Sequence, residues 1–156
     1  MEIRRACSSD IPGILHLLHQ VIRIHADIRP DLFKGEGSKY TAEQLEKKLE
    51  DSGEIILVCV DGEGTVKGYV FGVSEQTEET SGTYAHKTIY IDDLCVDENV
   101  RKEHIGTKLY QSMCEYAKSH GYDRITLHVW QGNSPAQTFY QSMGMRPMYT
   151  AMEQTL

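Results

Sequence analysis

Three strand-like runs follow one another in the middle of the chain, and this succession constrains the fold more than any other feature. The runs are EIILVCVD at 54–61, VKGYVFGV at 66–73 and KTIYIDDLCV at 87–96. The turn DGEGT joins the first two runs, and the polar stretch SEQTEETSGTY before the third is typical of a long hairpin loop. The sequence therefore predicts that these runs form the centre of one sheet.

Helix and strand signals alternate on both sides of this centre. Residues 1–6, 124–130 and 147–156 have the pattern of further strands. Helices are expected to begin at a cap among Ser8, Ser9 and Asp10, at the capping box of Thr41 and Gln44, near Ile105, and at Ser134 and Pro135. The order β-α-α-β-β-β-α-β-α-β predicts a mixed α/β (α+β) fold in a single domain over residues 1–156.

Charge and composition exclude several classes of function. The net charge of −7 argues against a nucleic-acid-binding protein and is compatible with a cationic small molecule as partner. No apolar run is long enough for a membrane span, and the first residues do not resemble a signal peptide, so a cytoplasmic protein is expected. The four cysteines lack zinc-type spacing, and His16 and His19 have no partner at fitting distance in the sequence, so no metal is expected.

The stretch DENVRKEHIGTKLY, residues 97–110, places basic side chains at the start of a predicted helix. Arg101, Lys102 and His104 there oppose the partial positive charge of a helix N-terminus, and an anion would neutralise both. Gly106 removes a side chain where such an anion approaches the backbone. Two interpretations remain open at this point, a phosphate-binding site and a helix start that is basic by chance.

A second segment, NSPAQTFYQSMGM at 133–145, bears on the interpretation of residues 97–110. Together they resemble the GCN5-related N-acetyltransferase superfamily, whose (Arg/Gln)-x-x-Gly-x-(Gly/Ala) loop holds the acetyl-CoA pyrophosphate. Arg101 to Gly106 match that loop, with His104 in place of its first glycine. The resemblance implies acetyl-CoA as co-substrate, an amine as acceptor, and a central, mostly antiparallel mixed sheet flanked by about four helices.

The resemblance also implies the roles of individual residues. Tyr140 would be the general acid for the departing thiolate, and Asp92 would be the base, directly or through water. Their structural alternatives are a core tyrosine and a carboxylate that binds loop N–H groups or an arginine. Strand alternation is expected to separate Asp92 from Asp93. The cofactor-binding residues would be Leu94, Cys95 and Val96 through a backbone bulge, Arg101, Lys102, Glu103, His104, Ile105, Gly106 and Thr107 in the loop and helix start, and Asn133, Ala136 and Tyr140.

The acceptor stays open between small-molecule amines and protein amino groups. In similar proteins it is set by the first helices, their connecting loop and the hairpin before the last strand. The corresponding segments here are residues 22–40 and the polar loop 74–84. A hypothesis from another class is a non-catalytic module of the same fold that binds CoA or serves as a scaffold. Similar proteins commonly form homodimers, and a homodimer is a further hypothesis for this chain.

Overall fold

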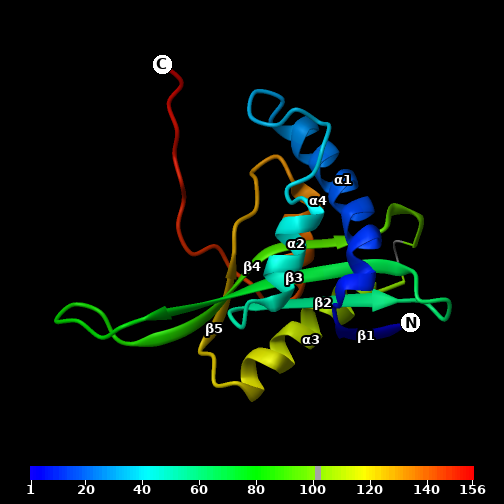
Figure 1. Ribbon diagram of the computed structural model, residues 1–156. Helices are drawn as coiled ribbons and strands as arrows, with labels where there is room; N and C mark the ends of the chain where they lie inside the picture. Colours follow the sequence, from blue (N-terminus) through cyan, green and yellow to red (C-terminus); the bar gives the residue numbers. More distant parts are fainter. Residues whose placement is uncertain (101–102) are drawn as a thin grey trace.

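A five-stranded sheet in the order β1-β2-β3-β4-β5 forms the centre of the molecule in the computed structural model, which describes residues 1–100 and 103–156 (Figure 1). Neighbouring strands are antiparallel except for the parallel pair β4 and β5. This confirms the predicted mixed, mostly antiparallel sheet. The strands are β1 Glu2–Arg5, β2 Glu54–Val60, β3 Val66–Thr77, β4 His86–Val96 and β5 Arg124–Leu127.

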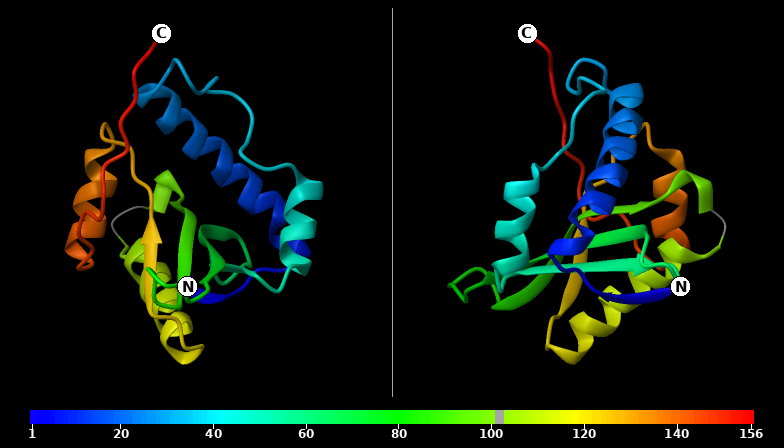
Figure 2. Two further views of the ribbon diagram at one scale, coloured as in Figure 1. Left: turned by 90° about the vertical axis from the view of Figure 1, so that its left-hand side faces the viewer. Right: turned by 45° about the vertical axis from the view of Figure 1, so that its right-hand side comes forward.

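Helices cover both faces of this sheet. The described residues contain four, α1 Ile11–Ile28, α2 Ala42–Glu50, α3 Ile105–Ser119 and α4 Ser134–Ser142. Local capping signals mark two of their starts. The N–H of Gln44 donates to Oγ1 of Thr41 at 3.2 Å and the N–H of Thr41 donates to Oε1 of Gln44 at 2.9 Å, which confirms the capping box. The helices α1 and α2 lie on one face, and α3 lies on the other (Figure 2).

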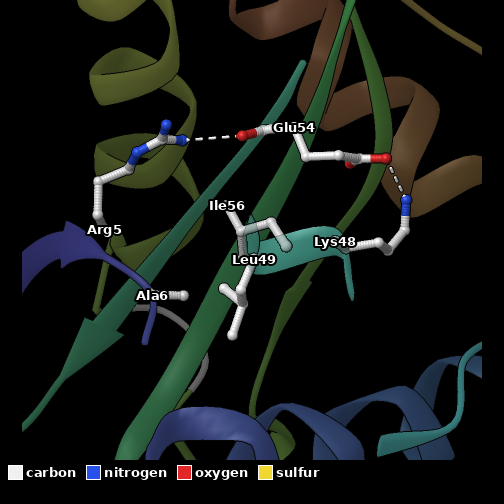
Figure 3. Close-up of a pocket in the computed structure, with 6 residues that line it drawn as sticks. All are labelled: Arg5, Ala6, Lys48, Leu49, Glu54 and Ile56. Atoms are coloured by element: carbon white, nitrogen blue, oxygen red, sulfur yellow. Dashed lines mark hydrogen bonds and ion pairs between the residues drawn. The ribbon is translucent and has the colours of Figure 1, made fainter. Parts of the chain in front are cut away.

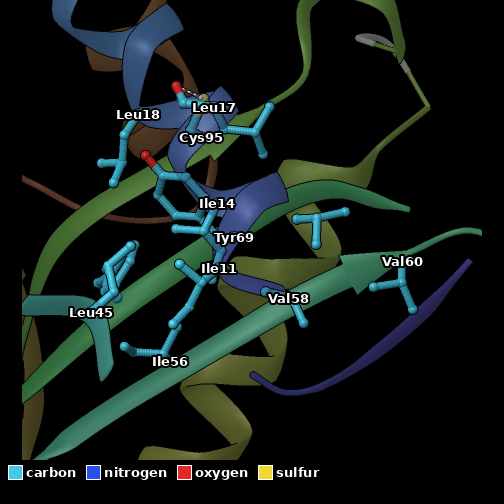
Figure 4. Close-up of a cluster of buried hydrophobic side chains, with 12 residues drawn as sticks. Ile11, Ile14, Leu17, Leu18, Leu45, Ile56, Val58, Val60, Tyr69 and Cys95 are labelled. Carbon is cyan, nitrogen blue, oxygen red and sulfur yellow. Dashed lines mark hydrogen bonds between the residues drawn. The ribbon is translucent and has the colours of Figure 1, made fainter. Parts of the chain in front are cut away.

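Two apolar clusters fill the spaces between helices and sheet. The first, which we call the α1 cluster, joins α1 and α2 to the sheet, and the second, the α3 cluster, lies beneath α3. Figure 4 draws the first, with Tyr69 and Cys95 reaching it from the strands. The α1 cluster contains Ile11, Ile14, Leu17, Leu18, Leu45, Ile56, Val58, Val60, Val66, Tyr69, Phe71 and Cys95. The α3 cluster contains Ile55, Leu57, Cys59, Val70, Ile89, Ile91, Ile105, Leu109, Tyr110, Met113 and Ala117.

Gly13 lies where α1 packs closely on β3, so its replacement by alanine is expected to destabilise the protein. A Cβ at this position would lie 2.8 Å from Cβ of Val66, which is too close for any real contact. Overpacking of this kind costs about 1–3 kcal/mol of unfolding free energy, whereas helix propensity alone predicts a gain of about 1 kcal/mol. Urea denaturation measures the difference. Gly62→Ala, in an open turn with nothing within 4 Å of a new Cβ, is the control; a stabilised Gly13→Ala variant would contradict this packing.

The predicted last strand is wrong. Residues 147–156 form no strand, and the segment runs as an extended tail from the end of α4 (Figure 1). Hydrogen bonds attach it at two places, where Arg29 binds Glu153 and where the Tyr149 hydroxyl lies 2.6 Å from Nε2 of His128. The neighbouring strand β5 ends at Leu127 instead of continuing to residue 130. A strand exists only where its backbone has a paired neighbour, and the tail has none in the described chain.

Two remaining features concern the cysteines and the membrane-spanning capacity of the helices. Cys7, Cys59, Cys95 and Cys114 form no disulfide in the described part of the chain, and Cys59 and Cys95 are buried. Among the described residues, no helix combines the length and the apolar character needed to cross a bilayer.

Candidate active site

The strands β4 and β5 separate in the middle of β4, and the candidate site lies at this point. Pairing between them runs from Thr88 to Ile91 on β4, and β4 then continues to Val96 without β5. On its other side the stretch 94–96 stays paired with β3. One edge of this part of β4 therefore faces the interval between the two strands. The predicted pantetheine-binding residues Leu94, Cys95 and Val96 lie along it.

Asp92 forms a β-bulge at the point where the strands separate. In the β3–β4 register Gly72 pairs with Ile91 and Phe71 pairs with Asp93, so Asp92 is the extra residue. The bulge reverses the alternation of β4. Ile91 belongs to the α3 cluster before it, whereas Cys95 belongs to the α1 cluster after it. The bulge lies two residues before the position that the sequence analysis expected.

The Asp92 carboxylate accepts two hydrogen bonds from the loop between α1 and α2. Nζ of Lys39 lies 2.8 Å from Oδ1 and also donates to the Asp92 backbone carbonyl at 3.0 Å. The Tyr40 hydroxyl donates to Oδ2 at 2.5 Å. Burial and the neighbouring Asp92 raise the pKa of Tyr40 well above its ordinary value, so this hydroxyl remains a donor. The loop thus holds the carboxylate in one orientation, with a cation beside it.

Asp93 is a second carboxylate at the same place, and the sequence analysis assigned it no role. Its Oδ2 accepts a hydrogen bond from the Tyr69 hydroxyl at 3.0 Å. Burial raises the pKa of Asp93 to about 6, although Lys39 and the Tyr69 bond act in the opposite direction. The expected separation of the two acids fails because the bulge interrupts alternation. The partners of both, Tyr40 and Tyr69, pack against Phe71 on the α1 side of the sheet.

Tyr140 approaches this region from α4. Its ring centroid lies 5.1 Å from that of Phe139 and 6.3 Å from that of Tyr110. Burial first, and then the charge of Asp93, raise the pKa of Tyr140 well above its ordinary value. The phenol therefore keeps its proton at neutral pH. The contacts of its ring lie with α4 and with the α3 cluster.

The start of α3 completes the site. His104 has φ 58° and ψ 21°, the left-handed conformation that glycine adopts most easily, and α3 begins at the next residue. This backbone requirement explains why the family loop carries glycine at that position. The first helical hydrogen bond runs from the N–H of Lys108 to the carbonyl of His104 at 3.0 Å. The N–H groups of 105–107 precede that bond and are the donors expected at a helix start.

The other predicted loop residues vary in their surroundings. Arg101 and Lys102 lie outside the described residues. Glu103 is exposed and Ile105 is buried in the α3 cluster, whereas Gly106 and Thr107 are partly buried. A Cβ on Gly106 would lie 3.5 Å from Cγ2 of Val96 and 3.6 Å from the Phe139 ring, which is ordinary contact. Gly106 thus brings the start of α3 next to the end of β4 and to α4.

Asn133 and Ala136 are accounted for by helix capping. The Asn133 side-chain oxygen accepts a hydrogen bond from the N–H of Ala136 at 3.2 Å and so caps α4. A contact with the cofactor stays a prediction for both residues.

A small cavity elsewhere does not belong to this site. It has a volume of about 50 Å³ and lies between the end of β1, α2 and the start of β2 (Figure 3). Its Lys48–Glu54 ion pair, at 2.5 Å, lies along one wall. The volume suits water molecules and not a cofactor. Among the described residues, no three His, Cys, Asp or Glu side chains are grouped to hold a metal ion.

Comparisons with known proteins agree with this arrangement. The sequence pattern of the acetyltransferase (GNAT) family matches residues 18–145. Thialysine N-epsilon-acetyltransferase of Bos taurus is 28% identical over 96% of this chain and 86% of its own length. GCN5-related N-acetyltransferase 6, chloroplastic, of Arabidopsis thaliana is 31% identical over 43% of this chain, and the match spans only 23% of that protein.

Two solved structures have the same fold over nearly the whole chain. A tetramutant of the BH1408 protein from Bacillus halodurans superposes with a TM-score of 0.95 at 32% identity, and each chain is covered completely. Glucosamine-6-phosphate N-acetyltransferase from Arabidopsis thaliana superposes with a TM-score of 0.73 at 20% identity, covering 99% of this chain and 97% of that chain. At the second identity the likeness concerns the fold alone.

Proposed function

The chain belongs to the acetyltransferase (GNAT) family, and from this premise we propose that it transfers the acetyl group of acetyl-CoA directly to a primary amine. One observation carries the choice of a primary amine: Asp92 binds an alkylammonium group, that of Lys39, at the β4 bulge. A protein similar to this chain, thialysine N-epsilon-acetyltransferase, is also named for acetylation of an amino group. A screen of amine acceptors distinguishes a small-molecule acceptor from a protein acceptor.

The donor would lie along the open edge of β4 with its pyrophosphate at the start of α3. The N–H groups of 105–107 and the absence of a side chain at Gly106 suit a phosphate there. Arg101 and Lys102, known here from the sequence alone, would add positive charge, and Glu103 and His104 complete the loop. Leu94, Cys95 and Val96 would offer backbone groups to the pantetheine arm, with Asn133 and Ala136 near the thiol end.

Catalysis would use the two carboxylates and Tyr140. Asp92 binds the acceptor ammonium and takes its proton, directly or through water. Asp93, with a pKa of about 6, is the neighbouring carboxylate that can hold that proton. Tyr140 donates a hydrogen bond to the departing thiolate. Because the charge of Asp93 helps to raise the pKa of Tyr140, protonation of Asp93 makes Tyr140 a stronger acid at the moment when the thiolate leaves.

The alternative function is a non-catalytic CoA-binding module. One observation favours it, because Asp92 already has two hydrogen-bond partners within the chain. Turnover with any amine excludes this alternative. A homodimer stays a prediction, with the outer edge of β5 and the tail 147–156 as the surfaces for a second copy.

Calorimetric titration with acetyl-CoA tests the proposal, and Gly106→Glu is expected to weaken binding by about 10-fold or more. The new carboxylate would repel the pyrophosphate, whereas its Cβ makes only ordinary contacts and the helix start tolerates an acid. Gly62→Glu adds the same charge in an open turn and should leave the affinity unchanged. The absence of binding at millimolar acetyl-CoA would overturn the proposed function.

A further inference from the structure

Lys39 brings a primary amine of the chain itself to the carboxylate that the proposed function assigns to the acceptor. Its Nζ lies 2.8 Å from Oδ1 of Asp92 and 3.0 Å from the Asp92 carbonyl oxygen, so two acceptors of the β4 bulge bind one ammonium. The carbonyl belongs to the extra residue of the bulge. The position is therefore shaped for an alkylammonium group by backbone and side chain together.

The neighbouring residue holds Lys39 at this place. Tyr40 donates to the other oxygen of Asp92 at 2.5 Å, and its ring lies 6.0 Å from that of Phe71 in the α1 cluster. Nζ of Lys48 lies 4.7 Å from the centroid of the Tyr40 ring and also forms the ion pair with Glu54. The end of the α1–α2 loop is thus attached to both the sheet and α2.

The Lys39 side chain itself remains able to exchange with solvent. It is 40% exposed, whereas the Asp92 side chain is 15% exposed. An ion pair of this kind contributes little to stability, so its presence does not require Lys39 to stay in place. The charge of Lys39 also acts on Asp93 and on His25, which places it among the groups of the proposed acceptor site.

We propose that Lys39 is an internal acceptor, whose Nζ is acetylated by acetyl-CoA bound in the same chain. The inference rests on the proposed function, because it requires the donor at the open edge of β4. It goes further in naming one modification site and in stating that an external amine competes with Lys39 for Asp92.

The reaction balances with groups already placed at the site. The Lys39 ammonium gives one proton to Asp92, and the nitrogen lone pair attacks the thioester carbonyl carbon. A C–N bond forms, the C–S bond breaks and CoA leaves as a thiolate. The nitrogen loses a second proton as the adduct collapses, and the thiolate gains one through the Tyr140 hydroxyl. Asp92 returns its proton to water, and the products are an amide, free CoA and one proton.

Peptide mass spectrometry after incubation with acetyl-CoA tests this site. Lys39 is expected to gain an acetyl group about 100-fold faster than Lys47, because positioning and proton transfer act only at the first. Lys47 is the matched reference, since it also pairs with a carboxylate, at 3.0 Å from Glu43, but is 73% exposed on α2. It reports uncatalysed acetylation by the same reagent.

Further measurements distinguish catalysed acetylation of Lys39 from its uncatalysed reaction with acetyl-CoA. Tyr140→Phe is expected to slow acetylation of Lys39 by about 100-fold and to leave Lys47 unchanged. The first-order rate at Lys39 should stay constant when the protein is diluted, as a reaction within one chain requires. Lys39→Arg keeps a cation beside Asp92 and removes the amine, so this variant should bind acetyl-CoA without gaining the fast-forming acetyl group.

The possible results distinguish failure of the Lys39 inference from failure of the proposed function. Equal rates at Lys39 and Lys47, or a rate at Lys39 proportional to protein concentration, would overturn the inference. If acetyl-CoA binds and an added amine is acetylated while Lys39 is not, the inference fails and the proposed function stands. If calorimetry detects no acetyl-CoA binding, the proposed function itself fails.

Discussion

Tyr140→Phe is expected to lower kcat by about 100-fold or more, since a positioned proton donor contributes about that much to a transfer reaction. The hydroxyl is the only group removed, and the ring keeps its contacts with Phe139 and Tyr110. Because the phenol carries its proton throughout the neutral range, loss of the hydroxyl should act on the departure of the thiolate. Affinity for acetyl-CoA should change little, and steady-state kinetics together with calorimetry separate the two effects.

Tyr110→Phe is the matched control for this variant. Tyr110 lies next to Tyr140 but on α3, where burial, and then Cys114, raises its pKa to about 12. Its hydroxyl has no role in the proposed reaction, so its removal should leave kcat within about threefold of the wild-type value. Equal rates for Tyr140→Phe and the wild type would remove Tyr140 from the mechanism.

Asp93→Asn is expected to reduce activity and to increase stability at neutral pH. The partly buried carboxylate has a pKa of about 6 in the folded protein, above the value of about 3.9 for an unfolded chain. The proton thus binds more tightly to the folded state. The stability contributed by this group is complete below about pH 4 and is lost as pH rises through 6. At pH 7 the charged form therefore costs up to about 3 kcal/mol, which asparagine avoids while still accepting the Tyr69 hydrogen bond.

Urea denaturation at about pH 4 and about pH 7 measures this difference. The gain in unfolding free energy of Asp93→Asn should be close to zero at the lower pH and largest at the higher one. The activity profile gives a second readout, because kcat/KM of the wild type should fall below a pH of about 6 and that limb should disappear in the variant. Glu63→Gln, at an exposed position of the turn between β2 and β3, should change neither quantity. A variant that is less stable at pH 7 would show that the Asp93 charge is compensated in the fold.

Features with local causes were predictable from the sequence. The capping box at Thr41 and the start of α4 at Ser134 need only three or four neighbouring residues, and both are found where the pattern predicts them. The order of the elements up to α4 is also confirmed. These signals are decided within one turn of helix or one strand, so a single sequence contains them completely.

Features that depend on a distant partner were not predictable in the same way. The alternating pattern of 147–156 suits a strand, but no neighbouring strand pairs with it. Lys39 and Tyr40 reach Asp92 from more than 50 positions away, and nothing in their local sequence indicates this. The bulge at Asp92 arises from the register between β3 and β4, so the position of Asp93 on the same side as Asp92 was not predictable either. The pair of adjacent acids in an apolar strand was the one available signal.

The bulge at Asp92 makes the length of β4 matter as much as its composition. Deleting the extra residue Asp92 would restore regular pairing, with Ile91 still opposite Gly72 and Asp93 still opposite Phe71, so Asp93 would stay on the α1 side of the sheet. Substitutions test side chains one at a time, but this deletion would remove the bulge and the Asp92 carboxylate together and leave Asp93 to Val96 on their present faces. A comparison of this strand with that of another protein is therefore correct only if it allows a gap beside the two acids.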